Sequence, residues 1–394
     1  MLVNRIKDLK RCVIPITNSR TLIRVTGQDS VKMLQGLTTN NIARLVDVQH
    51  TNPGSLYTGF LSASGRLLFD AFVLHEQHAS TITSSASSVA KVDNSANETL
   101  LIDVDSEVAT RAIEHLNFYK MRNKLKIENA TSDYSILTVL DKTYKSVRDD
   151  KLFVHLKEEN CTVLMDPRHQ LMGLRLLVPS SKASAINTVL SAFHQETEDV
   201  YQLYRAQNGI PQGLKDYSFD KIIPLEYNFD LLNGVDFHKG CYLGQELMSR
   251  THYTGLIRKR VFPVVMSPAN GNKSNLDPAR KEHHLLFSQK VLDSIDVQSP
   301  EKDSELKITV DASTVSSPFN DPSTPSTAPP SRSSEKFLSG YNNVGLAMIK
   351  VDHIDASSFD STKIIDNQGR PLQVIEPCWW SKVVGLQVPV QAVS

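Results

Sequence analysis

The chain has 394 residues, and its 43 basic side chains balance its 43 acidic side chains, so the formal net charge is zero. Hydrophobic residues make up 40% of the chain and charged residues 22%, a composition typical of globular proteins, and the length suffices for two or three domains. The neutral balance argues against a nucleic-acid-coating protein, and no apolar run approaches the roughly 20 residues that span a bilayer.

The N-terminal 28 residues differ from the rest because they carry six Lys or Arg and a single acid, Asp8. Apolar residues recur at helical spacing between the basic ones. A basic, acid-poor, amphipathic start resembles a mitochondrial transit peptide, and the alternative is a solvated basic helix of the mature protein. We therefore expect residues 1–20 to be a transit peptide that ends before a strand beginning at Thr21, and the protein to reside in the mitochondrial matrix.

The body of the chain alternates strands and helices. Asp70 interrupts the apolar second strand of a predicted hairpin, where it fits an outward-facing strand residue or a carboxylate that points into a cavity. Strand–helix–strand units of this size are typical of ferredoxin-like α+β domains. The periodicity predicts strands at 21–25, 100–103, 125–127 and 165–177, the hairpin at 57–74, and helices from Asp29 or Ser30 and at 108–116, 183–193 and 200–208.

Two stretches rich in small polar residues are predicted to be insertions. The first is a flexible segment at about 84–98. In the second, residues 313–334 hold 16 Ser, Thr or Pro in 22 positions, too few apolar groups to offset the chain entropy of folding. We therefore expect a disordered insertion at about 298–337, within a final β-rich domain that also has strands at 344–351 and 372–388.

Common catalytic signatures such as the P-loop, G-x-G-x-x-G, H-E-x-x-H and G-x-S-x-G are absent, and the four cysteines are too far apart for a zinc ribbon. The densest group of chemically useful residues surrounds Cys241. Gly240 and Gly244 permit a tight turn and the close approach of a ligand or partner. Lys239 and His238 can lower a thiol pKa, and a thiolate is the ligand that iron–sulfur clusters prefer.

A single cysteine cannot hold an iron–sulfur cluster, which normally takes four protein ligands. Further ligands for a cluster on Cys241 would come from a second protein or a small thiol. His238 has the spacing of an additional ligand, although such a histidine is more often structural. A nucleophilic Cys241 would need a base, for which His238 and His252 are candidates that the sequence does not position.

A second segment places Glu226 after I-P-L in a mostly apolar stretch. It fits a surface residue after a turn or a buried acceptor for paired N–H donors, such as a pterin ring edge. Trp379 and Trp380 could stack on such a ring, although core packing is the simpler expectation. The basic residues 258–260 fit a solvated edge or, with a folate ligand, a site for its polyglutamate tail.

The segment K-G-C-Y-L-G-Q-E at 239–246 resembles the signature of the YgfZ-type iron–sulfur cluster assembly factors. These are relatives of the glycine-cleavage T-protein (GcvT), a tetrahydrofolate-dependent aminomethyltransferase. The resemblance covers about residues 21–388 outside the low-complexity stretches, and with the transit-like start the chain is similar to the mitochondrial member. Shorter segments agree in the expected order: L-Q-G-L-T-T-N, S-G-R-L-L-F-D, Y-K-M-R, N-G-I-P, I-P-L-E and V-G-L-A.

The resemblance implies a three-lobed α+β fold with a ferredoxin-like lobe, a C-terminal antiparallel β-barrel and a central folate-type cavity. The GcvT-like region would cover residues 21–252 and the barrel domain residues 253–394. It implies a non-catalytic role in maturing mitochondrial [4Fe–4S] proteins, among them aconitase-type and lipoate- or biotin-forming enzymes, together with A-type iron–sulfur carriers. A folate-dependent aminomethyltransferase and a folate sensor that couples one-carbon status to cluster assembly are the alternatives.

The resemblance also assigns residues. Cys241 carries over as the motif cysteine, which would be a shared ligand of a transient cluster, and Glu226 matches the T-protein glutamate that holds the pterin. The remaining motif residues are Lys239, Gly240, Tyr242, Gly244, Gln245, Glu246 and Arg250, and a bound tetrahydrofolate would contact Asn40, Arg66 and Asp70 in addition to Glu226.

Overall fold

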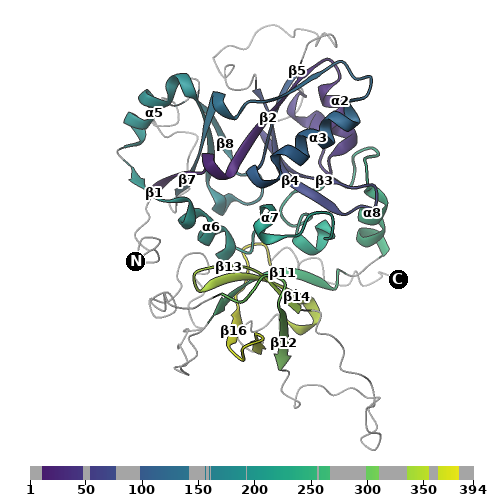
Figure 1. Ribbon diagram of the computed structural model, residues 1–394, viewed down its shortest axis with the longest axis vertical. Helices are drawn as coiled ribbons and strands as arrows, with labels where there is room; N and C mark the ends of the chain where they lie inside the picture. The colour runs from purple at the N-terminus through teal and green to yellow at the C-terminus, as the bar shows by residue number, and fades with distance from the viewer. Residues whose placement is uncertain are drawn as a thin grey trace, which may run out of the picture.

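The structure is a computed structural model that describes residues 11–47, 54–76, 98–141, 161–191, 193–254, 257–266, 299–309, 335–354 and 363–380, with residues 156 and 159. Two lobes, each built on a five-stranded sheet, lie side by side above a closed six-stranded barrel (Figure 1). The predicted three-lobed α+β fold with a C-terminal antiparallel barrel is confirmed. None of the described helices is long and apolar enough to cross a membrane.

The first lobe contains the predicted hairpin and strand–helix–strand unit. Its sheet has the strand order β3-β4-β5-β2-β6. The hairpin strands β3 and β4 are buried along their whole length, which their almost continuous apolar sequence requires. The elements are β2 (Arg20–Gly27), α2 (Ser30–Leu37), β3 (Ser55–Leu61), β4 (Leu67–His75), β5 (Glu98–Asp105), α3 (Ala109–Lys120) and β6 (Lys126–Asn129).

The second lobe has the strand order β10-β1-β7-β9-β8, with β1 parallel to β10 and the other neighbours antiparallel. Helix α5 packs beside this sheet, and α6 runs between the sheet and the barrel (Figure 1). The elements are β1 (Arg11–Pro15), β7 (Tyr134–Asp141), β8 (Thr162–Met165), β9 (Leu174–Pro179), α5 (Ala183–Leu190), β10 (His194–Gln195) and α6 (Glu198–Gln207).

Strand β1 lies inside the segment expected to be a transit peptide. It pairs with β7 and β10, and Cys12 and Ile14 are fully buried. Removal of residues 1–20, the expected transit peptide, would therefore take away a paired strand together with its core side chains. A leader that leaves this fold intact ends before Arg11.

The barrel closes in the order β11-β14-β13-β12-β15-β16. Strand β12 and the start of β13 fall within residues 298–337, so the predicted disordered insertion is shorter than expected. The centre of that insertion lies outside the described residues. Most of the segment 84–98 also lies outside them. The strand predicted at 372–388 ends at Val374. The strands are β11 (Lys259–Met266), β12 (Glu305–Thr309), β13 (Glu335–Tyr341), β14 (Val344–Lys350), β15 (Lys363–Ile365) and β16 (Pro371–Val374).

The connection between the lobes and the barrel contains α7 (Gly213–Asp216), the 3₁₀ helix η8 (Pro224–Tyr227) and α8 (Gln245–Thr254). Asp216 is fully buried and joins the two parts, since its carboxylate accepts hydrogen bonds from Arg205 on α6 and from Ser339 (2.5 Å) and Tyr341 (2.7 Å) on β13. Trp379 donates a hydrogen bond to the Gly209 carbonyl (2.9 Å). Other 3₁₀ helices are Thr17–Ser19, Ile42–Leu45, Ser106–Val108, Thr131–Asp133, Gln170–Met172, Ser180–Lys182 and Val351–His353.

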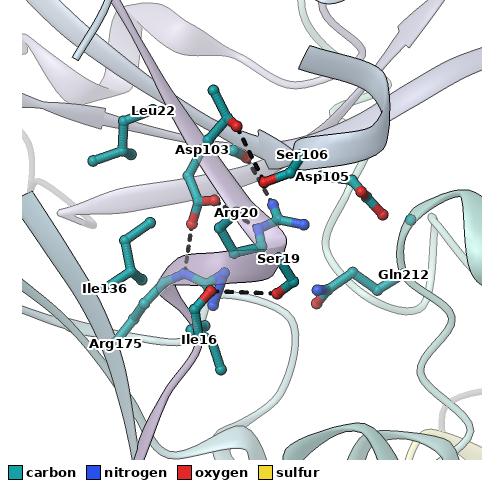
Figure 2. A network of polar contacts seen from close by, with 12 residues as sticks. Ile16, Ser19, Arg20, Leu22, Asp103, Asp105, Ser106, Ile136, Arg175 and Gln212 are labelled. Carbon is teal, nitrogen blue, oxygen red and sulfur yellow. Dashed lines mark hydrogen bonds and ion pairs between the residues drawn. The ribbon is translucent and has the colours of Figure 1, made fainter. Parts of the chain in front are cut away.

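A buried carboxylate joins the two lobes to each other. Figure 2 shows Asp103, on β5, between the guanidinium groups of Arg20 and Arg175. Its two oxygens accept hydrogen bonds from Arg20 Nε (2.7 Å) and Arg175 Nε (2.9 Å), and all three side chains are at most 2% exposed. Because Arg175 lies on β9 of the other sheet, this ion pair network fixes how the sheets sit against one another.

Candidate functional site

The candidate site is built around the motif loop, residues 239–244, which leads into α8. Cys241 is exposed, and its thiol is free. The loop is attached to the first lobe, since the Leu243 N–H donates to the Gly36 carbonyl at the end of α2 (2.9 Å). The structure thus presents the motif cysteine on a segment that is anchored on both sides.

Lys239 anchors the start of the loop. Its Nζ donates to the carbonyls of Gln35 (2.7 Å), Thr38 (2.6 Å) and Asn40 (2.8 Å), at the C-terminal end of α2. Burial lowers the pKa of Lys239 to about 8, although Asp236 acts in the opposite direction. Since these carbonyls occupy the ammonium group, its role in the structure is to cap the helix, whereas the sequence suggested activation of the thiol.

Gly244 and Gly240 meet different surroundings. Gly244 has φ of +77°, and a Cβ placed on it would lie 2.5 Å from the Ser62 carbonyl oxygen and 2.9 Å from the Gly65 Cα in the β3–β4 turn. Gly65 is also at positive φ and lies against Leu247 of α8. A Cβ on Gly240 would have no atom within 4 Å. The fold therefore requires a glycine at 244, while the glycine at 240 leaves open space beside Cys241.

The end of the loop forms the start of α8. Gln245 accepts a hydrogen bond from the Tyr242 N–H (3.1 Å) through its side-chain oxygen. Tyr242 is half-buried, and burial raises the pKa of its hydroxyl to about 12. Glu246 is exposed in the first turn of α8, where its charge suits the helix dipole, and Arg250 is exposed one turn further along.

Neither candidate base is directed to Cys241 by the structure. His252 stacks on Phe237, with ring centroids 3.6 Å apart and an angle of 12° between the planes. His238 lines a groove whose lining residues do not include Cys241. Among the described residues, no three His, Cys, Asp or Glu side chains are grouped as metal ligands.

The groove has a volume of about 640 Å³ and is lined by segments 165–170 and 230–238 together with Asn40 and Arg44. Asn40 is almost fully buried, and its amide donates to the carbonyls of Tyr57 and Asn233 (both 2.8 Å), which fixes the segment that follows α2. Cys241 is not among the groove's lining residues.

Glu226 and Arg66 belong to segments that contact α8. Helix η8, which carries Glu226, contacts both α8 and β11. Burial raises the pKa of Glu226, while the charges of Lys259 and Arg66 act in the opposite direction. Arg66, in the β3–β4 turn, donates to the Lys221 carbonyl (3.2 Å). The turn, η8 and the motif helix are therefore neighbours in space.

Asp70 is fully buried on β4, so an outward-facing strand residue is the wrong interpretation. Its carboxylate accepts hydrogen bonds from the Tyr57 hydroxyl (3.3 Å), the Tyr217 hydroxyl (2.5 Å) and the Gly213 N–H (3.0 Å). Tyr57 begins the predicted hairpin and Tyr217 lies 147 residues beyond Asp70, so nothing in the sequence indicated that their hydroxyl groups meet at this carboxylate.

The remaining candidates are mostly structural. Arg260 is buried and forms an ion pair with Asp230 (2.8 Å), Lys259 is half-buried and Arg258 is exposed, so the three residues do not form one basic edge. Trp379 and Trp380 are buried against Phe262, which confirms core packing. The sequence indicates Gly65 as a turn residue of the hairpin, but its contact with Leu247 of α8 appears only in the structure.

Comparison with known proteins places this arrangement in context. Residues 258–382 match the family described as CAF17, C-terminal beta-barrel domain. A protein of Dictyostelium discoideum named iron–sulfur cluster assembly factor IBA57 homolog, mitochondrial, is 45% identical and covers 99% of this chain and 98% of its own length. The Mycosarcoma maydis protein of the same name is 30% identical, over 86% of this chain and 75% of its own.

A solved structure extends the comparison to the fold. The glycine cleavage system aminomethyltransferase T from Bartonella henselae superposes with a TM-score of 0.61 at 11% sequence identity. The superposition covers 96% of this chain and 89% of the other. The two proteins therefore share the three-lobed fold.

Proposed function

Since the chain belongs to the IBA57 family of mitochondrial iron–sulfur cluster assembly factors, we propose that it matures [4Fe–4S] proteins of the mitochondrial matrix by offering Cys241 to an A-type iron–sulfur carrier. Its clients would include aconitase-type enzymes and the enzymes that form lipoate and biotin. The observation that carries this proposal is an exposed thiol on a loop anchored at both ends.

The thiol acts as one ligand among several. Iron–sulfur clusters normally take four protein ligands, so Cys241 shares the cluster with ligands from the carrier. The thiol loses its proton to solvent, its sulfur binds a cluster iron, and one bond between that iron and a carrier ligand breaks. This exchange needs no change in oxidation state. The open space at Gly240 allows the carrier to approach the sulfur closely.

The residues assigned to tetrahydrofolate fit that cofactor poorly. Asp70 and Asn40 are buried and already engaged by protein groups, while Glu226 and Arg66 lie near α8. A pterin would have to displace these contacts, so we derive no step through folate. For the same reason we infer that the protein acts as a non-catalytic assembly factor and that aminomethyl transfer is the less supported function.

A rescue experiment tests the role of the thiol. In cells depleted of the protein, wild type is expected to restore aconitase activity and protein lipoylation, and Cys241→Ser is expected to restore neither, because a hydroxyl does not replace a thiolate as a cluster ligand. A [2Fe–2S] enzyme should remain unaffected throughout. Cys378→Ser, which changes a half-buried cysteine far from the loop in sequence, is the matched control and should rescue fully.

The same variants can be compared with purified components. Anaerobic mixing of the full-length chain with a cluster-loaded A-type carrier should change the visible absorption and circular dichroism of the cluster, and Cys241→Ser should abolish the change. Full rescue by Cys241→Ser in cells, or an identical spectral change in vitro, would reduce Cys241 to a structural residue.

A further inference from the structure

The turn that follows α3 holds a methionine in a conformation that favours glycine. The Asn123 N–H donates to the Lys120 carbonyl (2.8 Å), which closes a four-residue turn, and Met121 has φ of +43° and ψ of −113°. These angles are those of the first central position of a type II′ turn, where glycine dominates. A side chain at this position strains the backbone, and such strain often marks a functional site.

The surrounding structure imposes this conformation. The Lys124 N–H donates to the Asp29 carboxylate (2.7 Å), and Leu125 is buried. The backbone of residues 124–125 lies against Gly27 so closely that a Cβ there would be 2.3 Å from the Lys124 carbonyl oxygen. The contacts with Asp29 and Gly27 therefore hold the turn in place, and the Met121 side chain is exposed to solvent.

That side chain has no part in the core. Met121 is 83% exposed, and Phe118, one helical turn before it, is 75% exposed. Residues 117–126 contain four basic residues and no acidic one. Lys126 pairs with Glu128 at the edge, which leaves Lys120, Arg122 and Lys124 around the two apolar side chains. We call these five residues, Phe118, Met121, Lys120, Arg122 and Lys124, the α3 patch.

We propose that the α3 patch is a docking surface for a protein partner whose own surface offers an apolar pocket bordered by carboxylates. A strained, solvent-exposed methionine beside an exposed phenylalanine fits such a pocket, and the unbalanced positive charge selects an acidic rim. The partner to which we assign it is the iron–sulfur carrier that meets Cys241, an identity that rests on the proposed function.

The turn that carries the α3 patch and the motif loop are attached to opposite ends of the same short helix, α2. The turn after α3 is bonded to Asp29, directly before α2, whereas the motif loop is bonded to the C-terminal end of α2 at Gly36. Helix α2 has eight residues, so its ends are about 12 Å apart. An interface of ordinary size, about 800 Å² on each protein, spans that distance.

Binding of the full-length chain to an apo A-type carrier, measured by calorimetry together with thermal unfolding, tests the proposal. Met121→Ala and Phe118→Ser are expected to weaken binding at least tenfold. Met121→Gly is expected to weaken binding equally while raising the melting temperature by about 2 °C, because glycine relieves the strain. A residue with only a structural role would not give opposite changes in affinity and stability.

Met165→Ala is the matched control, because Met165 is 47% exposed on β8 and should leave binding unchanged. Wild-type affinity for Met121→Ala and Phe118→Ser would overturn the docking surface but leave the role of Cys241 intact. If the wild-type chain does not bind the carrier at all, both the docking assignment and the proposed partner are wrong. Arg122→Glu should weaken binding further and reduce its salt dependence.

Discussion

At the scale of single residues, the two glycines of the motif loop have different roles: Gly244 is needed for stability, and Gly240 leaves space beside Cys241. Gly244→Ala should lower the free energy of unfolding by about 1–3 kcal/mol, because positive φ and the Ser62 carbonyl oxygen both oppose a side chain. Gly240→Ala should change it by less than about 0.5 kcal/mol, since the added methyl group enters open space. Urea denaturation measures both values.

The same pair of variants tests the open space beside Cys241. Gly240→Ala should slow cluster transfer from the carrier despite its normal stability, because a methyl group next to the thiol limits close approach. Wild-type transfer by Gly240→Ala would show that this space is not part of the interface, and wild-type stability of Gly244→Ala would refute the packing argument.

Residue types and spacing predicted the motif around Cys241, but they did not predict which groups its side chains contact. Cys241 could be singled out because its neighbours in sequence are also its neighbours in the loop. Lys239 could not be interpreted correctly, since its acceptors are the carbonyls of residues 35, 38 and 40, about 200 positions away. Asp70 was ambiguous for the same reason, because the hydroxyl of Tyr217 comes from a distant segment.

At the scale of elements, Asp103 on β5 controls the contact between the two sheets. Asp103→Asn should lower the free energy of unfolding by about 3–5 kcal/mol, because it removes the negative charge from between two buried guanidinium groups. Glu128→Gln, which alters a solvent-facing pair with Lys126 on β6, is the matched control and should change stability little. Equal effects of the two substitutions would contradict a special role for the buried carboxylate.

The pH dependence follows from the same carboxylate. Burial alone would raise the pKa of Asp103, but the charges of Arg175 and Arg20 outweigh burial and hold it below its ordinary value of 3.8. Stabilisation by the charged form is therefore fully present above pH 4 and is lost as the pH falls through the folded-state pKa. Denaturation at several pH values should show the difference between wild type and Asp103→Asn shrinking below pH 4.

Helices and strands that are marked by their own sequence pattern were predicted. Strands that form only by pairing with segments far away in the sequence were not. The hairpin β3–β4 and helices α2, α3 and α6 follow from periodicity and from turn residues. Strand β1 was not predicted because its basic neighbours resemble a leader, and its pairing with β7 and β10 reveals it. The strand predicted at 372–388 ends at Val374, and beyond it Trp379 and Trp380 pack against Phe262 of the barrel.

At the scale of the whole molecule, Asp216 links the barrel to the lobes. Asp216→Asn should separate thermal unfolding into two transitions, because the carboxylate that joins α6 to β13 loses its charge beside Arg205. Calorimetry of the full-length chain measures this. Asp366→Asn, which affects a carboxylate bonded to Arg370 within its own hairpin, should lower stability without uncoupling the two parts. A single transition in Asp216→Asn would contradict the prediction.

The position of β1 has a consequence for how the protein is made. Cys12 lies opposite Leu140 on one side and His194 on the other, so the N-terminal strand cannot complete its sheet until about half of the chain is available. Contacts so distant in sequence slow folding, and unpaired strand edges favour aggregation while they wait. A chain that is synthesised or delivered N-terminus first therefore keeps its earliest strand unpaired longest, and folding yield should depend on what shields β1 during that time.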